Sequence, residues 1–363
     1  MWYHNSNKTF KRFSMNKYVA YVSSYTQGNK FGISIFDVDM KKGRFTEKDR
    51  VKVSNSSYIT ISHNQKFLYS ITDLGVEAYE VLEDGGLKNL NMQSINGMRG
   101  CYLSTSYDDK FLFVAGYHDG KITVLRLHDD GSIGEITDEV YLKGMGTVSD
   151  RNYRPHVNCV KMTRDNQYLL AADLGMDHVN VYDLNHTTGK IKLCDIIRSD
   201  QESAPRHIKF SKDGKYLYII HELKNSIDVY TYTNIAHGNP SFELIQSVPT
   251  LNAYHTQGSA SSALNISEDF KYITASNAGD NSVCLFKIHE DGTLEKLFCL
   301  PVSGDYPKDA ALFPDDRHLV SCNHDSDTLT FFSVDVEKKT LVMNGPEMKV
   351  EKPNCIIFHK LVK

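Results

Sequence analysis

Three residues that can exchange protons or bind anions occur in similar local contexts in this chain. His156 follows Arg154-Pro155, which favours extended backbone because the residue before a proline avoids the helical region. A histidine at such a position can exchange a proton near neutral pH. Arg206, in SAPRHIKF, offers a planar cation for a carboxylate, a phosphate or a developing oxyanion. Glu222, in IIHELKNS, can orient the imidazole or balance its charge.

The elements that would position these residues are repeated strands. A polar turn followed by an apolar and aromatic run recurs seven times, with starts 49, 44, 57, 48, 56 and 46 residues apart. Each run precedes a second strand of alternating character and a turn rich in Gly or acidic residues, a pattern typical of antiparallel strands. Four short strands in about 50 residues make one propeller blade. The seven runs begin at Lys17, Lys66, Lys110, Gln167, Lys215, Lys271 and Arg317.

The strand that precedes each turn shows how the ring would close. Units two to seven each have such a strand, whereas the missing copy for unit one stands at the far end as PNCIIF, residues 353–358. We therefore expect an all-β, seven-bladed propeller over residues 17–363, with the C-terminal strand completing the first blade and removing an open edge. Two sandwiches or a parallel β-helix would not require this offset. Residues 1–16 are expected to be a loose N-terminal extension, and whether residues 1–14 belong to the native protein stays open.

The starts of the first strands and the ends of the second strands should converge on one face of the channel. An isolated histidine at a strand end is more often a structural hydrogen-bonding group, and Arg or Glu at a blade edge more often forms a salt bridge between blades. Three such residues at equivalent places on adjacent blades favour a site. The further residues predicted to bind substrate there are Arg154, Asn158, Asp173, His207, Lys308, Asn323 and Asn354.

Composition narrows the possible partners and compartments. With 41 Lys and Arg against 45 Asp and Glu, the net charge of −4 argues against nucleic acid. No stretch approaches the roughly 20 apolar residues of a membrane helix, and the N-terminus lacks a secretory signal. Seven cysteines without a CxxC favour free thiols and the cytoplasm. The 15 histidines include no HxH or HExxH, so we expect neither a catalytic metal nor a cofactor, and a monomer or weak homodimer.

Two segments carry a family resemblance. RPHVNCVKMTRDNQYLLAADLGMDHVNVYDL and APRHIKFSKDGKYLYIIHELKNSIDVY resemble the lactonase family of seven-bladed propellers, which includes the propeller-type 6-phosphogluconolactonases and the carboxymuconate-lactonising enzyme. The resemblance covers roughly residues 17–360. Its motifs correspond here to Pro155-His156, Pro205-Arg206-His207 and His221-Glu222-Leu223. It implies acid–base and anion-binding roles for His156, Arg206 and Glu222.

The chain departs from the family pattern in the sixth and seventh blades. Ala263 and Asn265 stand where the family usually has an acidic residue and a basic residue or histidine. Ala278 replaces a common arginine, and Lys308 stands for the arginine that often opens the last blade.

Three functions are compatible with this pattern. The first is hydrolysis of a sugar lactone, with 6-phosphogluconolactone of the pentose phosphate pathway as the implied substrate. There His156 would act as base, Glu222 would hold the imidazole and Arg206 would stabilise the oxyanion or phosphate. The second is opening or closure of another carboxylated lactone. The third is a propeller that has lost catalysis and binds a metabolite or a protein partner.

Overall fold

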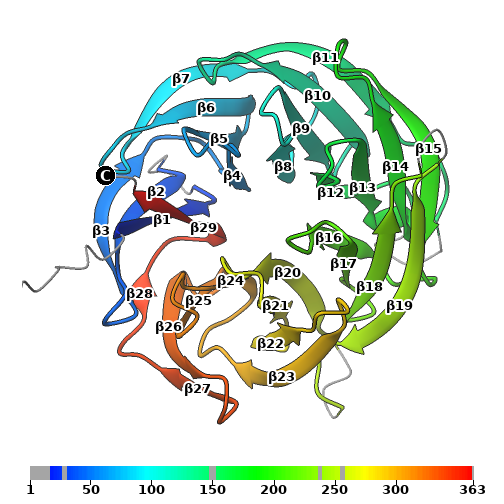
Figure 1. The fold of residues 1–363 in the computed structure, drawn as a ribbon. Coiled ribbons are helices and arrows are strands. Elements are labelled where there is room, and N and C mark those ends of the chain that lie inside the picture. Colours follow the sequence, from blue (N-terminus) through cyan, green and yellow to red (C-terminus); the bar gives the residue numbers. More distant parts are fainter. Residues whose placement is uncertain (1–16, 27–30, 147–152, 236–238, 254–257, 362–363) are drawn as a thin grey trace, which may run out of the picture.

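Seven antiparallel sheets stand around a central axis (Figure 1), so the chain folds as a seven-bladed β-propeller. The computed structural model describes residues 17–26, 31–146, 153–235, 239–253 and 258–361. Nearly all regular structure in these ranges is β-strand, which confirms the predicted fold class. The extension predicted over residues 1–16 lies outside the described residues.

Each blade is built from consecutive strands, with the exception of the first. Blades one to three contain β29 (Pro353–Leu361), β1 (Lys17–Ser24), β2 (Ile33–Asp39) and β3 (Arg44–Val51); β4 (Ile59–Ile61), β5 (Phe67–Thr72), β6 (Gly75–Val81) and β7 (Leu87–Gln93); and β8 (Tyr102–Thr105), β9 (Phe111–Gly116), β10 (Lys121–Leu127) and β11 (Ile133–Tyr141).

The remaining blades follow the same plan, and β28 adds a short fifth strand to the last. Blades four to seven contain β12 (Val157–Met162), β13 (Tyr168–Asp173), β14 (His178–Leu184) and β15 (Ile191–Arg198); β16 (Pro205–Phe210), β17 (Tyr216–His221), β18 (Ser226–Thr233) and β19 (Ser241–Pro249); β20 (Ala260–Ile266), β21 (Tyr272–Ala278), β22 (Ser282–Ile288) and β23 (Leu294–Pro301); and β24 (Pro307–Leu312), β25 (His318–Asn323), β26 (Thr328–Asp335), β27 (Thr340–Met343) and β28 (Met348–Lys349).

The ring closes where the first and last strands meet. β1 pairs with β29 in antiparallel register from Lys17 opposite Leu361 to Ser24 opposite Pro353. The strand predicted at residues 353–358 therefore completes the first blade, as expected, and continues to Leu361. This pairing covers an edge that would otherwise be open to other chains.

Buried tyrosines tie three blades to the blade that follows each of them. In each case the hydroxyl donates to the carbonyl of a glycine in a turn of the next blade, and that glycine has a positive φ, between 79° and 85°. A side chain would not fit there, since a Cβ on Gly131 would lie 2.1 Å from Phe67. The pairs are Tyr21 with Gly85 (2.8 Å), Tyr69 with Gly131 (3.1 Å) and Tyr218 with Gly292 (3.1 Å).

The innermost strands arrange equivalent residues in rings around the channel. One ring, here called the polar mouth, lies near the starts of these strands. A second ring, the lysine mouth, lies three residues further along, which is about 10 Å in an extended strand. The polar mouth consists of Ser57, Cys101, Asn158, Arg206, Lys308 and Asn354, and the lysine mouth consists of Thr60, Lys161, Lys209, Asn265, Ala311 and Ile357.

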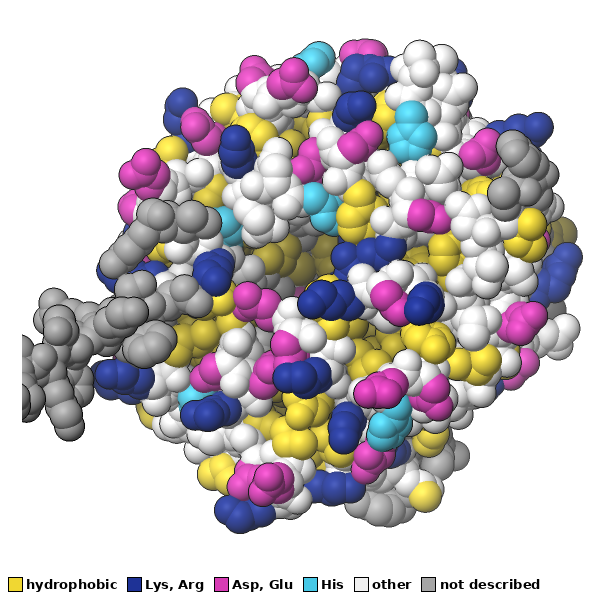
Figure 2. All heavy atoms as spheres, viewed as in Figure 1, with side chains coloured by type: hydrophobic (Ala, Val, Ile, Leu, Met, Phe, Trp, Pro, Cys, Tyr) yellow, Lys and Arg dark blue, Asp and Glu magenta, His cyan; other side chains and the backbone are white. Residues whose placement is uncertain are grey.

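Aromatic side chains fill the channel between the two mouths. The Tyr58 and Tyr102 rings lie 4.2 Å apart, and the His207 ring lies 5.2 Å from Tyr102. A separate cavity lies at each mouth, and of their described lining residues the two share Tyr58 alone. The channel is therefore two recesses with an aromatic plug between them. On the face shown in Figure 2 the centre is hollowed, with hydrophobic side chains inside the hollow and lysine or arginine beside it.

No helix in the described ranges has the length and hydrophobicity needed to cross a membrane.

Candidate active site

A cavity of about 220 Å³ at the polar mouth gathers half of the predicted site residues. They come from the starts of innermost strands in blades four, five, seven and one, as the repeat alignment predicted. Loops that follow the second strands supply Tyr25, Tyr117 and His118, and the remaining wall comes from the innermost strands or the residues just before them. The predicted residues that line the cavity are Asn158, Arg206, His207, Lys308 and Asn354, and the other lining residues are Tyr25, Ser57, Tyr58, Cys101, Tyr117, His118 and Asp309.

Two cations lie against the ring of Tyr25 at this cavity. The ammonium of Lys308 is 4.7 Å and the guanidinium carbon of Arg99 is 4.8 Å from the ring centroid. Burial, together with the charges of Arg206 and Arg99, lowers the pKa of Lys308 to about 8. Because a bound anion would relieve this repulsion, the cluster is electrostatically suited to a phosphate or a carboxylate.

Arg206 is held by a buried carboxylate. Its Nη1 forms an ion pair with Oε2 of Glu222, whose side chain is 1% exposed whereas that of Arg206 is 20% exposed. The guanidinium is therefore anchored on one side and reaches the cavity on the other. Such an anchored donor is preorganised for charge that develops in a reaction.

His156 is buried and is not among the residues that line the cavity, but it packs against Tyr117, which does line it. The two rings stack with centroids 4.3 Å apart, and Nδ1 of His156 is 2.8 Å from the carbonyl oxygen of Tyr117. Since a carbonyl can only accept, Nδ1 carries the proton and the imidazole lone pair is on Nε2. Glu222 was expected to hold this imidazole. Tyr117 and Asp173 also contact His156, and Asp173 accepts the His156 backbone N–H at 2.8 Å, so the role of Glu222 at the imidazole stays a prediction.

Asp173 has a positioning role at the end of β13. Its Oδ1 also accepts the backbone N–H of Gly175 and so caps the short 3-10 turn η1 (Leu174–Met176). Burial raises the pKa of the Asp173 carboxyl to about 6. These bonds shape the loop around His156, and the predicted contact of Asp173 with substrate stays a prediction.

Two further predicted residues lie away from the centre of the cavity. Arg154 donates to the carbonyl oxygen of His118 at 2.8 Å and so braces a lining residue. Asn323 is buried in blade seven, where its amide bonds Ser321 and the hydroxyls of Thr328 and Thr330. Its contacts are those of a structural residue of the blade.

The blade-six departures from the family pattern have local structural roles. Asn265 donates to Oδ1 of Asp309 at 2.5 Å and to the carbonyl oxygen of Ala310. Ala263 and Ala278 are buried. Blade six therefore contributes no charge at these three positions.

Sequence reasoning missed Tyr25, Arg99, Tyr117 and His118, which stand outside the innermost strands. Tyr25 and Tyr117 directly follow the second strands of their blades, as Glu222 does, so the repeat could have pointed to them. Ser57 and Cys101 could have been found, because each occupies the ring position of Arg206 in its own blade.

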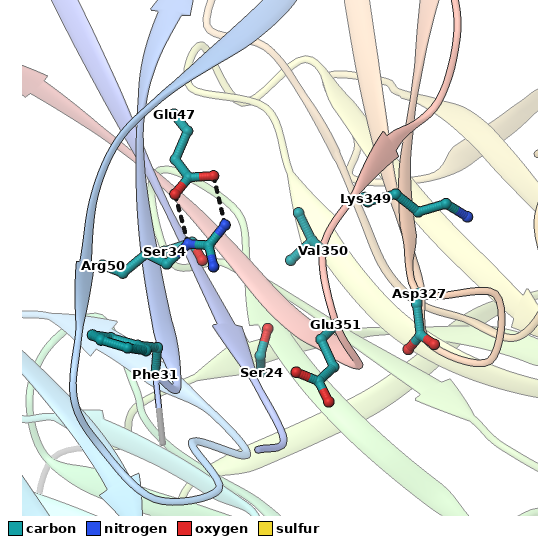
Figure 3. Close-up of a pocket in the computed structure, with 9 residues that line it drawn as sticks. All are labelled: Ser24, Phe31, Ser34, Glu47, Arg50, Asp327, Lys349, Val350 and Glu351. Carbon is teal, nitrogen blue, oxygen red and sulfur yellow. Dashed lines mark hydrogen bonds and ion pairs between the residues drawn. The ribbon is translucent and has the colours of Figure 1, made fainter. Parts of the chain in front are cut away.

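A different cavity, of about 360 Å³, lies between blades one and seven (Figure 3) and has none of the predicted residues in its described lining. There Arg50 pairs with Glu47, with Nε 2.6 Å from Oε1. Asp327 accepts the backbone N–H of Lys352. Within the described ranges, no group of three His, Cys, Asp or Glu side chains is arranged to hold a metal ion.

Comparison with known proteins shows the family of this propeller. The pattern described as "Lactonase, 7-bladed beta-propeller" matches residues 19–358, so the chain belongs to the lactonase family of seven-bladed β-propellers. The 6-phosphogluconolactonase of Bacillus subtilis (strain 168) is 30% identical over 356 residues, which cover 95% of this chain and 99% of that protein. The 6-phosphogluconolactonase of Formosa agariphila is 29% identical, covering 90% and 97%.

Among solved structures, the periplasmic gluconolactonase of Pseudomonas aeruginosa is similar throughout. It is 25% identical to this chain, with a TM-score of 0.87, and the match covers 95% of this chain and 100% of that one.

Proposed function

We propose that the protein is a lactone hydrolase with an anionic sugar lactone, 6-phosphogluconolactone, as its substrate. The observation that carries the proposal is the convergence of Arg206 and Lys308 in one cavity, with Arg99 against the same Tyr25 ring. Relatives named 6-phosphogluconolactonase supply the reaction class. A phosphorylated lactone offers both an anion for these cations and a carbonyl for attack.

In this mechanism a water molecule attacks the lactone carbonyl carbon while Nε2 of His156 accepts its proton, directly or through one further water. Arg206 stabilises the negative charge that develops on the carbonyl oxygen. Collapse of the tetrahedral intermediate breaks the bond to the ring oxygen, which receives the proton from His156. The product is the open hydroxy acid, and Lys308 holds the phosphate throughout. The reaction consumes only water and needs no cofactor.

The test is hydrolysis of freshly generated 6-phosphogluconolactone by the wild type, His156→Ala and His118→Ala, against a blank without enzyme. His118 is the matched control because it is a second histidine beside Tyr117 and itself lines the cavity. The proposal expects saturable acceleration that is lost in His156→Ala and largely kept in His118→Ala. The reverse order would assign the base to His118, and a wild-type rate equal to the blank would overturn this substrate. Unphosphorylated gluconolactone, run in parallel, measures the contribution of the phosphate.

A second candidate is a propeller that binds a metabolite without turnover. It is favoured by Ala263 and Ala278, which supply no charge where the family pattern implied it. Folded protein that binds 6-phosphogluconate in calorimetry yet leaves the lactone at the blank rate would support it. Turnover of a carboxylated lactone only would instead favour the carboxymuconate type of reaction.

We further propose that the protein acts in the cytoplasm on small molecules. The support is that all seven cysteines are free thiols, five of them buried, as suits a reducing compartment. Fractionation of the source cells tests this, and recovery outside the cytoplasm would contradict it.

A further inference from the structure

The cavity at the lysine mouth is larger than the one at the polar mouth and is not used by the proposed reaction. Its volume is about 650 Å³. Its wall includes Lys161 and Lys209 from two adjacent innermost strands. The aromatic plug closes it off from the cavity that contains Arg206.

The two lysines occupy the same position in neighbouring blades. Lys161 of β12 stands opposite Leu170, and Lys209 of β16 stands opposite Tyr218, each one residue before the last of its strand. Equivalent register gives the two side chains the same orientation toward the channel. Two ammonium groups therefore enter one recess from adjacent walls.

Among the described residues neither amine forms an ion pair with a carboxylate, although the charge of Lys209 acts on the buried carboxyl of Asp309. Burial and the charge of Lys209 lower the pKa of Lys161 to about 8. The nearby acid Glu268 accepts a hydrogen bond from Tyr18. Asp309 is buried, where it accepts the backbone N–H of Ile356.

The other charges around this mouth leave it positive. The charges of Lys161 and Arg164 contribute to a lowered pKa of about 4 for His63, of which burial is the main cause. Lys360 stands on the rim. A recess with two ammonium groups that form no ion pair among the described residues has a favourable place for an anion, because a counter-ion would offset their repulsion and the water that Lys161 loses on burial.

The rest of the wall is largely apolar. Tyr58 and Tyr102 form part of it, and Ile61, Phe270 and Pro314 also line it. An inorganic ion would leave this surface uncovered. A ligand with an apolar or aromatic body would bury it, as in most small-molecule sites.

We propose that the lysine mouth is a second binding site, for a small organic anion whose phosphate or carboxylate lies between Lys161 and Lys209 and whose apolar body packs against Tyr58 and Phe270. This site is independent of the proposed hydrolysis. It shares only the aromatic plug with the polar mouth.

Calorimetric titration with phenylphosphate at pH 7 tests the proposal. The variants are Lys161→Met/Lys209→Met, the polar-mouth variant Arg206→Met/Lys308→Met, and the control Lys192→Met, which removes an exposed lysine of β15. We expect the polar-mouth variant and the control to retain binding at the lysine mouth. In the double lysine variant the affinity for phenylphosphate at the lysine mouth should fall by about tenfold or more, which corresponds to the loss of one ion pair.

The opposite results overturn the proposal: unchanged binding in the double lysine variant, or loss of all binding in the polar-mouth variant. Thermal melts check that each variant is folded. If the double lysine variant does not fold, the single variants Lys161→Gln and Lys209→Gln replace it. Benzoate in a parallel titration distinguishes a carboxylate from a phosphate site. If inorganic phosphate binds as tightly as phenylphosphate, the proposal that the ligand has an apolar body is overturned. Failure of lactone hydrolysis would leave these titrations unaffected, so the two proposals fail separately.

Discussion

The two mouths of the channel are built from the same seven strands yet differ in how their cations are held. At the polar mouth, Glu222 anchors Arg206, and Lys308 lies against Tyr25 and donates to Asn354 at 3.3 Å. At the lysine mouth, Lys161 and Lys209 stand among apolar side chains. An anchored cation is suited to stabilising charge during a reaction, whereas two ammonium groups without an ion-pair partner among the described residues are suited to holding a ligand. The strand determines where each cation stands, and the neighbouring side chains determine what that cation can do.

Of the substitutions that should affect one mouth and leave the other unchanged, the largest effect is expected at His156. Its replacement by Ala should lower kcat for the lactone by about 1,000-fold, because the general base is lost. Phenylphosphate binding at the lysine mouth should be unchanged in calorimetry. Turnover that survives in His156→Ala would contradict the assignment of the base.

Replacement of Arg206 by Met should lower kcat/KM by about 100-fold, which is the usual cost of losing one oxyanion donor. It also leaves Glu222 buried without its cation, so the melting temperature should fall. Arg206→Lys keeps a positive charge and should recover part of the stability. If both variants melt like the wild type, the ion pair contributes little to folding.

A smaller, pH-dependent effect is expected at Lys308. Its pKa is lowered to about 8, so the ammonium loses its proton as the pH rises through 8 and the affinity for a phosphorylated lactone should fall. KM should therefore increase between pH 7 and pH 9 in the wild type. In Lys308→Arg, which stays charged, KM should change little over the same range. Equal pH profiles would show that another group controls binding.

The smallest effect is expected at Asp173. Asp173→Asn keeps an oxygen that can accept the backbone N–H of His156, so kcat should fall only a few-fold. The wild-type carboxyl, whose pKa is raised to about 6, becomes protonated as the pH falls through 6, and that part of the acid-side loss of rate should be absent in the variant. A loss as large as that of His156→Ala would give Asp173 a direct chemical role.

Much of this architecture could be predicted from the repeats. The strand at residues 353–358 and the ring position of Arg206 both follow from period and register, because a propeller repeats its inner strand in every blade. The ion pair of Glu222 with Arg206 could not be predicted, because a carboxylate at a strand end can point to its own blade or to the neighbouring one. Tyr25 and Tyr117 stand at the same place after a second strand as Glu222, but an aromatic residue there gives no signal of a site until the ring of the propeller brings cations against it.

The joint between β1 and β29 also determines how the molecule would respond to tension. Lys17 and Leu361 stand opposite each other, so both ends of the domain leave from the same end of the joint. A force that pulls the two ends apart would load the hydrogen bonds one after another, as a zipper opens, instead of all at once. The ring should therefore open at this joint under a weak pull. Heat, by contrast, has to break the hydrogen bonds between the two strands together.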